Sequence, residues 1–263
     1  MMPPKLYGRN ILITREKQQA QIFSDKVLER GGNPSVVPLL TISCKNHQDV
    51  MKPLQENTYF SWLFFTSVNG VHCFFQLLNF YNIDKAVLAE SKLAAVGQKT
   101  AKALDEYGYQ VDFIPSVYNA ETMRNEFNYS NTHTDEHILL IKGNRSRRVL
   151  PDWFKEQGIP FEQMEVYETA RNDASKDELN RQLRYNHPDI ITFTSPSSVD
   201  AFMTLKETAI SVNATIACIG TTTGERALDF GFRCPVVPNE FTIDGMLDQI
   251  GQYIEQKGWM DDE

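Results

Sequence analysis

Small polar side chains follow short apolar runs at six places along this sequence. An apolar run that ends in Ser, Thr or Gly is typical of a buried strand that passes into a helix, where a hydroxyl caps free N–H groups of the first turn. The same N–H groups and the helix dipole also bind anions. The turns therefore predict either structural caps or an anion-binding surface. They are Thr14-Arg15, Thr66-Ser67, Gly97-Gln98-Lys99-Thr100, Lys142-Gly143-Asn144-Arg145, Thr194-Ser195 and Gly220-Thr221-Thr222-Thr223.

Basic residues gather near these turns. Any one of them is typical of a solvated helix face, but as a group they are the best candidates for binding a ligand rich in carboxylates or phosphates. The densest run is Arg145-Ser146-Arg147-Arg148. The set is Arg15, Lys99, Lys102, Lys142, Arg145, Arg147, Arg148 and Arg226.

Three blocks of sequence occur twice, in the same order and about 125 residues apart. This spacing is longer than the roughly 20 to 50 residues of a solenoid repeat. It predicts two similar domains, with a place for a ligand between them. The paired blocks are 11–15 with 138–142, 65–71 with 193–199, and 95–100 with 218–223.

The elements that must hold these turns alternate between strand and helix. Short apolar runs with little polar alternation predict parallel strands buried on both faces. We expect strands at 10–14, 35–37, 62–66, 93–96, 111–114, 138–142, 161–166, 189–193, 216–219 and 234–237. We expect helices at 17–31, 68–80, 99–108, 146–157, 197–207, 222–231 and 242–256. This rhythm predicts an α/β chain of two doubly wound, flavodoxin-like domains, each with a five-stranded parallel sheet.

Two ways of dividing the chain into domains fit this pattern. The polar stretch at 128–137 favours two contiguous domains. The alternative is an interleaved division, in which the extended segments 39–42 and 166–169 pair as a two-stranded connector. Both divisions give five strands per domain, so the pattern does not choose between them.

Composition excludes several functional classes. The chain has 263 residues, 41% of them hydrophobic and 23% charged, which is typical of a globular protein. A net charge of −8 argues against nucleic-acid binding. The sequence has no apolar run long enough to span a membrane, and 1–5 does not resemble a secretory signal. Scattered cysteines predict free thiols in a cytoplasmic protein; they are Cys44, Cys73, Cys218 and Cys234.

Several catalytic and cofactor motifs are missing. The sequence has no dinucleotide or P-loop glycine fingerprint and no Gly-x-Ser-x-Gly elbow. His133 and His137 have the spacing of two zinc ligands, but no third ligand lies nearby in sequence, so we expect no metal site. Tyr167, in the second extended segment, is either a packing residue or a proton donor.

Taken together, the repeated motifs resemble the uroporphyrinogen-III synthase family over roughly residues 8 to 255. The order and duplication of the motifs carry the resemblance, since no single motif is specific. The sequence departs from the family pattern at Glu16, where Pro is common, and at Lys142, where Arg is common. The matching segments are 11–15 with Gln19-Ala20, 38–42, 65–71, 95–97, 142–145, 166–169, 193–197 and 219–223.

The resemblance implies the interleaved division, with 1–38 and 170–263 in one domain, 43–165 in the other, and connectors at 39–42 and 166–169. It also implies an enzyme of tetrapyrrole biosynthesis that needs no cofactor. Its substrate would be hydroxymethylbilane, a linear tetrapyrrole with eight carboxylates, which it cyclises with inversion of the last ring. We expect a cytoplasmic monomer that receives its substrate from hydroxymethylbilane synthase.

The resemblance assigns roles to residues of this sequence. Tyr167 is the candidate acid that assists loss of the substrate hydroxyl. Thr66, Ser67, Gly97, Ser195, Ser197, Thr222 and Thr223 are implied contacts of the substrate. We add Thr14, Arg15, Lys142 and Arg147, which lie at the same turns, as candidate carboxylate contacts.

Two other functions fit the same architecture. A solute-binding or sensor protein would close on an anionic ligand without chemistry, and turnover of a tetrapyrrole separates it from an enzyme. A sugar- or nucleotide-transferring enzyme would be indicated by binding of a sugar nucleotide.

Overall fold

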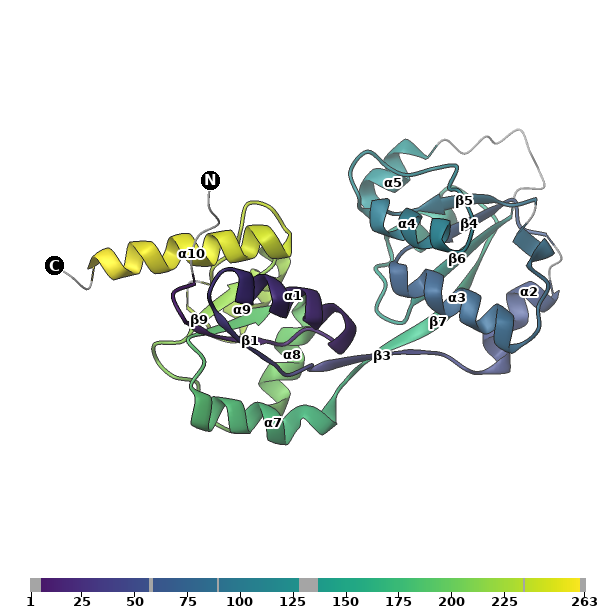
Figure 1. Ribbon diagram of the computed structural model, residues 1–263. Coiled ribbons are helices and arrows are strands. Elements are labelled where there is room, and N and C mark those ends of the chain that lie inside the picture. The colour runs from purple at the N-terminus through teal and green to yellow at the C-terminus, as the bar shows by residue number, and fades with distance from the viewer. Residues whose placement is uncertain (1–5, 57–58, 89, 128–136, 234, 261–263) are drawn as a thin grey trace. The chain divides into compact units, whose positions relative to one another are not determined.

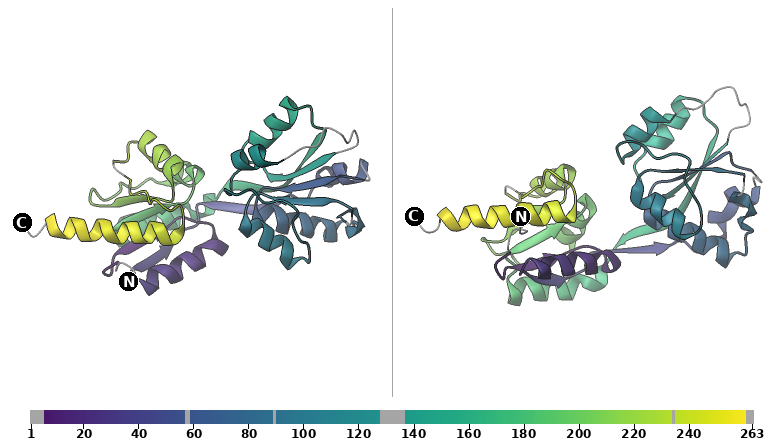
Figure 2. Two further views of the ribbon diagram at one scale, coloured as in Figure 1. Left: turned by 90° about the horizontal axis from the view of Figure 1, so that it is seen from above. Right: turned by 45° about the horizontal axis from the view of Figure 1, so that its top comes forward.

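The computed structural model describes residues 6–56, 59–88, 90–127, 137–233 and 235–260. The chain divides into two compact units (Figures 1 and 2). Unit 1 comprises residues 1–41 and 170–263, and unit 2 comprises residues 42–169. The chain therefore passes between the units twice.

Unit 1 contains a parallel sheet of order β2-β1-β8-β9. Its strands are β1 (Asn10–Ile13), β2 (Asn33–Val36), β8 (Ile190–Phe193) and β9 (Thr215–Cys218). A bridge from Ala217 to Val236 extends the sheet by one position beyond β9. Its α-helices are α1 (Lys17–Glu29), α7 (Lys176–Arg181), α8 (Pro196–Leu205), α9 (Thr221–Asp229) and α10 (Ile243–Met260).

Unit 2 contains a sheet of order β3-β7-β6-β4-β5. Its strands are β3 (Leu40–Cys44), β4 (Trp62–Phe65), β5 (Lys92–Ala95), β6 (Ile138–Gly143) and β7 (Phe161–Arg171). A bridge from Ala94 to Phe113 lies beyond β5. The helices are α2 (Lys52–Glu56), α3 (Val68–Phe80), α4 (Gln98–Glu106), α5 (Ala120–Glu126) and α6 (Val149–Glu156).

The two sheets share one strand arrangement, which explains the sequence repeat. The order β7-β6-β4-β5 in unit 2 corresponds strand by strand to the order β2-β1-β8-β9 in unit 1. The strand order reverses between β1 and β8 in unit 1 and between β6 and β4 in unit 2. In sheets of this kind, ligands bind at the carboxyl ends of the strands beside such a reversal.

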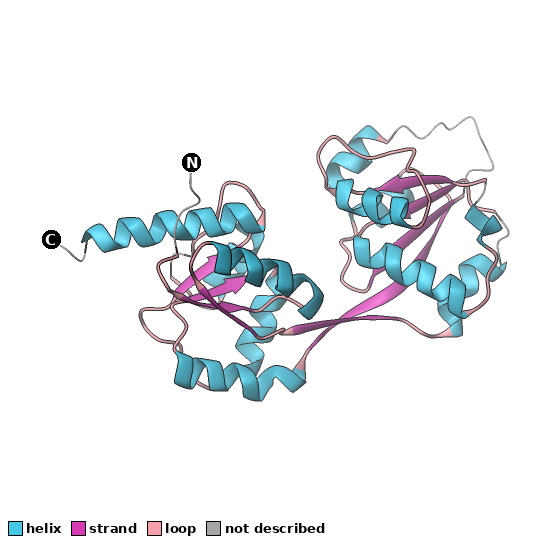
Figure 3. Ribbon diagram, viewed as in Figure 1, coloured by secondary structure: helices cyan, strands magenta, loops and turns pink. Residues whose placement is uncertain are grey.

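Helices cover both faces of each sheet (Figure 3), and alternate residues of the central strands pack against opposite faces. In unit 2, Phe65 packs with the α3 and α4 side, whereas Phe64 packs with the α5 and α6 side. In unit 1, Leu12 packs with the α8 side, whereas Ile13 packs with the α1 and α10 side. Burial on both faces is why these strands read as continuous apolar runs. The predicted class, two doubly wound α/β sheets, is confirmed.

Some predicted elements differ in detail. The run at 111–114 forms a single bridge at Phe113 in place of a full strand, and residues 235–237, the described part of the run at 234–237, form one at Val236. The short helices α2, α5 and α7 were not predicted, because five to seven residues carry too little periodicity to stand out. The two predicted connector segments, 39–42 and 166–169, belong to longer strands, β3 and the eleven-residue β7. Hydrogen bonds from Lys45 N to Val166 O and from Asn172 N to Leu39 O show that these strands run antiparallel.

The prediction that all four cysteines are free thiols is wrong. Cys44, at the end of β3, and Cys73, in α3, form a disulfide. Cys218 is free, and burial raises the pKa of its thiol to about 12. Cys234 lies outside the described residues. No helix in the described part of the chain is both long enough and apolar enough to cross a membrane.

Candidate functional site

The ring of Tyr167 lies directly on the backbone of Gly143. Strand β7 is parallel to β6, and an irregularity between Lys142 and Gly143 brings Gly143 opposite Tyr167. A Cβ atom at Gly143 would lie only 2.3 Å from Cζ of Tyr167. Glycine is therefore required here by the close approach of the ring. The contact fixes the phenol at the carboxyl end of β6.

A hydrogen-bond chain joins this phenol to the start of α3. Ser67 is the N-cap of α3, and its Oγ accepts a hydrogen bond of 3.0 Å from Gly70 N. The same hydroxyl donates to the Tyr167 hydroxyl oxygen, also at 3.0 Å. Tyr167 thus acts as an acceptor toward Ser67, and its own proton is available to another partner. The arrangement suits a phenol that donates a proton and is then stabilised by Ser67 as the phenolate.

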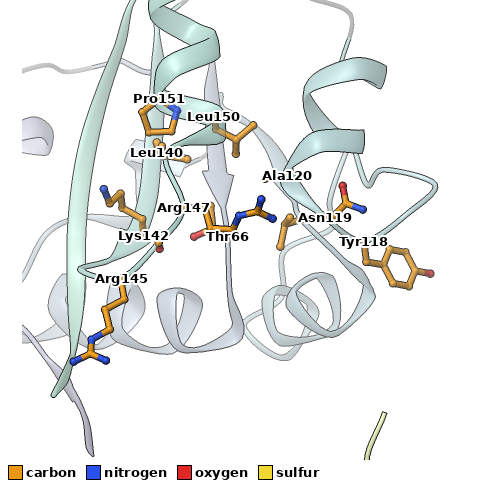
Figure 4. A pocket seen from close by; sticks show the side chains of 12 residues that line it. Thr66, Tyr118, Asn119, Ala120, Leu140, Lys142, Arg145, Arg147, Leu150 and Pro151 are labelled. Carbon is orange, nitrogen blue, oxygen red and sulfur yellow. The ribbon is translucent and has the colours of Figure 1, made fainter. Parts of the chain in front are cut away.

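A cavity of about 320 Å³ opens at the same edge of unit 2 (Figure 4). Thr66, Lys142, Arg145, Arg147 and Tyr118 are among the residues that line it. Arg147 extends toward the start of α5, where it pairs with Glu121, whereas Arg145 points away from the centre of the cavity. The cavity therefore combines an apolar floor with cations, as a site for an organic polyanion requires.

The cations of this cavity have weak protein partners. Lys142 Nζ lies 3.1 Å from the neutral side chain of Gln163. Arg147 forms an exposed ion pair with Glu121, and such pairs contribute about 0 to 1 kcal/mol. Arg145 is exposed and has no ion pair within the described residues. A ligand carboxylate could therefore replace these partners at little cost.

Arg15 holds the corresponding position in unit 1, at the carboxyl end of β1. Its Nε donates to Gln19 Oε1 at 2.7 Å, and its Nη2 contacts the same oxygen. Burial lowers the pKa of the Arg15 guanidinium, although the neighbouring Glu16 acts in the opposite direction. A partly buried guanidinium bonded to a neutral amide has capacity for a carboxylate.

The other predicted residues of unit 1 fall into two groups. Ser195 caps α8 by accepting from Ser198 N at 3.2 Å, and its Oγ lies 3.2 Å from Ser197 Oγ, so both hydroxyls lie at the carboxyl edge. Thr14 is different, because it is buried and its hydroxyl donates to Thr192 O at 2.7 Å. Its side chain pairs strands and is not presented to a ligand.

The helix starts at Gly97 and Gly220 carry no side-chain cap. Gly97 is the N-cap of α4 and Gly220 is the N-cap of α9, and neither position supplies a side-chain hydrogen bond. The first-turn N–H groups at these starts are therefore open to an anion. Thr222 is exposed in the first turn of α9, whereas Thr223 is buried and offers only its backbone.

Only one of the two histidines with the spacing of zinc ligands lies within the described residues. His137 Nε2 lies 3.5 Å from Glu162 Oε1, while His133 lies outside the described residues. Over the ranges that the structure describes, no group of three or more His, Cys, Asp or Glu residues could hold a metal ion.

The contacts made by Gly143 and Gln19 were not predicted from the sequence. The turn containing Gly143 was identified, but its contact with Tyr167 depends on the register between β6 and β7. Gln19 lies in the first turn of α1 and Arg15 just before its N-cap, and this closeness along the chain could have indicated their contact.

Known proteins resemble this chain along nearly its whole length. Residues 22–248 match the family model described as uroporphyrinogen-III synthase HemD. The porphyrin biosynthesis protein HemD of Ruminiclostridium josui is 27% identical over 250 residues, covering 95% of this chain and 49% of that protein. The chain thus spans about half the length of this relative.

Two further proteins match end to end. The uroporphyrinogen-III synthase of Synechococcus elongatus is 27% identical to this chain, and the match covers 97% of this chain and 99% of that protein. A crystal structure of a mutant uroporphyrinogen III synthase from Thermus thermophilus shares the fold, with a TM-score of 0.66 at 15% identity over 94% of this chain and 99% of that one. Because the family model covers most of the sequence, this chain belongs to the uroporphyrinogen-III synthase HemD family.

Proposed function

We propose that this protein is a uroporphyrinogen-III synthase, which converts hydroxymethylbilane into uroporphyrinogen III. The observation that carries the proposal is the family match over residues 22–248, which includes every strand-end turn of the site except Thr14-Arg15. In the proposed reaction, the substrate loses its hydroxyl as water, and the last ring attacks through its substituted carbon. A spiro intermediate then reopens with that ring inverted before the macrocycle closes.

Positioning is the main task of the proposed site, because the free substrate closes without inversion to the type I isomer. Holding reactive groups in one geometry supplies much of an enzyme's rate acceleration. The substrate carboxylates have suitable partners at the carboxyl edge of each unit: Arg15, Lys142 and Arg147 as cations, and the open helix starts at Gly97 and Gly220.

Tyr167 is proposed as the proton donor for loss of the hydroxyl. Its support is the Ser67 hydroxyl, which donates to the phenol oxygen at 3.0 Å and leaves the phenol proton free. As that proton moves to the departing hydroxyl, the same hydrogen bond from Ser67 stabilises the phenolate. Ser67 is therefore a positioning and stabilising residue.

We further propose a cytoplasmic monomer that takes its substrate from hydroxymethylbilane synthase and needs no metal or coenzyme. We also propose that 1–38 with 170–263 and 43–165 fold as separate domains. The test of function is product analysis after incubation with enzymatically generated hydroxymethylbilane. Type III product supports the synthase, whereas type I product alone, with the tetrapyrrole merely bound, supports the solute-binding alternative.

A further inference from the structure

Each unit exposes one aromatic ring at an equivalent position beside its candidate site. Tyr118 in unit 2 is 62% exposed, and Phe241 in unit 1 is 59% exposed. Tyr118 contacts Gly97, where a Cβ would lie 2.9 Å from Tyr118 Cβ. Phe241 contacts Gly220, where a Cβ would lie 3.4 Å from Phe241 Cγ.

The equivalence extends to the sequence and to the helices that follow. The interval from Gly97 to Tyr118 is the same as that from Gly220 to Phe241. Tyr118 immediately precedes Asn119, the N-cap of α5. Phe241 immediately precedes Thr242, whose hydroxyl accepts from Gly245 N at 3.0 Å at the start of α10. In each unit, therefore, an exposed aromatic ring lies next to the glycine at a helix N-cap.

A purely structural explanation exists for an apolar residue at this position. A residue just before an N-cap often packs against the fourth helical residue, as a hydrophobic staple. Those partners would be Met123 and Met246, and both are already buried in the helix-covered cores. Tyr118 and Phe241 belong to neither core cluster. Most of each ring therefore faces solvent, which is unfavourable for a large apolar surface.

The location of the rings indicates what would cover them. Tyr118 lies at the rim of the cavity that Thr66, Lys142 and Arg147 line, with its ring directed outward (Figure 4). A polyanion held by these cations and by the open start of α4 would bring its apolar skeleton over the rim. Flat heteroaromatic rings pack well on such surfaces in offset or edge-on geometry.

We propose that Tyr118 and Phe241 are positioning residues that pack against pyrrole rings of the linear tetrapyrrole. This inference rests on the proposed function, because it takes hydroxymethylbilane as the ligand. The carboxylate partners fix the edges of the substrate, and the two aromatic residues fix the planes of individual pyrroles. They contribute to holding the chain in the conformation that leads to ring inversion.

The test compares Tyr118→Ala, Phe241→Ala and the double variant with the conservative changes Tyr118→Phe and Phe241→Tyr. Matched controls are Phe80→Ala and Tyr185→Ala, which remove equally exposed rings near the amino ends of the strands. The assay measures kcat, KM and the ratio of type III to type I product, with the melting temperature as a check on folding.

Each single alanine variant should raise KM about 3- to 10-fold with kcat nearly unchanged, as expected for loss of an aromatic contact. In the double variant, the increase in KM should be about the product of the two single increases, and more type I product should be released. Both conservative variants should keep the wild-type KM. The inference is overturned if the alanine variants match the controls, or if only the melting temperature and kcat fall. If the wild-type protein itself makes no type III product, the proposed function fails first, and the two failures are distinguishable.

Discussion

Replacing Gly143 with Ala tests whether the Tyr167 phenol acts where the structure places it. The new methyl group would lie 2.3 Å from Tyr167 Cζ and 2.4 Å from Cε2. Ordinary carbon contacts need about 3.5 Å, so the ring must move by about 1 Å. The hydrogen bond from Ser67, now 3.0 Å, would then be too long or badly directed. The backbone at Gly143 does not require glycine, because its φ is not positive.

The expected loss of activity follows from the role given to the phenol. General-acid assistance is worth about 10² to 10⁴ in rate, but the substrate loses its hydroxyl readily unaided. We therefore expect Tyr167→Phe to lower kcat roughly 10- to 100-fold, or about 1.4 to 2.7 kcal/mol. Gly143→Ala should lower kcat by a similar factor, and overpacking should cost about 1 to 3 kcal/mol of stability. Type III product should persist, because many contacts set ring inversion.

The assay is steady-state turnover of hydroxymethylbilane by the two single variants and the double variant, with thermal unfolding measured in parallel. If both changes act through the phenol, Gly143→Ala should reduce kcat little further in the Tyr167→Phe background. Gly32→Ala is the control, since it crowds a Val27 methyl at 2.9 Å near the amino end of β2 and should cost stability without lowering kcat. Wild-type kcat in Gly143→Ala, or fully multiplicative losses in the double variant, would refute the reasoning.

Three further predictions concern stability and domain structure. Fragment 43–165 should unfold cooperatively on its own by circular dichroism, whereas 1–130 should not, because it would hold parts of two cores. Reduction of the Cys44–Cys73 disulfide, which closes a loop of 29 residues, should lower the free energy of unfolding by about 3 to 4 kcal/mol; denaturant curves with unchanged midpoints would contradict this. The hydrogen bond from Lys26 holds the pKa of Asp244 below its ordinary value, so Asp244 contributes stability above about pH 4 that is lost as the pH falls. Asp244→Asn should therefore cost up to about 1 kcal/mol at pH 7, and this cost should shrink as the pH falls below about 4.

The strand-end turns were predictable because the repeat and the apolar runs fix where each strand stops. Ser67, Ser195 and Gly97 lie at helix starts, as their residue types indicate. The sequence pattern could not show which of the hydroxyls at these turns already form hydrogen bonds within the protein. Thr14 and Thr66 have the same local sequence signal, and each hydroxyl donates to a neighbouring strand, Thr14 to Thr192 O and Thr66 to Ile141 O. Only Thr14 is buried.

Contacts between distant segments were beyond the reach of sequence reasoning. The spacing of Cys44 and Cys73 resembles no short motif, and their disulfide exists because β3 packs beside α3. The approach of Tyr167 to Gly143 arises from an irregular register that periodicity does not encode. Likewise, among the described residues, the segments around Phe113 and Val236 each make a single bridge, although their apolar runs look like those of full strands.

The most direct test of the central claim is the isomer composition of the product. Purified protein treated with a chelator and given no coenzyme should be supplied with freshly generated hydroxymethylbilane, and the products should be oxidised and separated as uroporphyrin isomers. Our account predicts mainly type III isomer, formed faster than spontaneous ring closure and at the same rate with or without the chelator. Type I isomer alone, at the rate of the protein-free control, would contradict it.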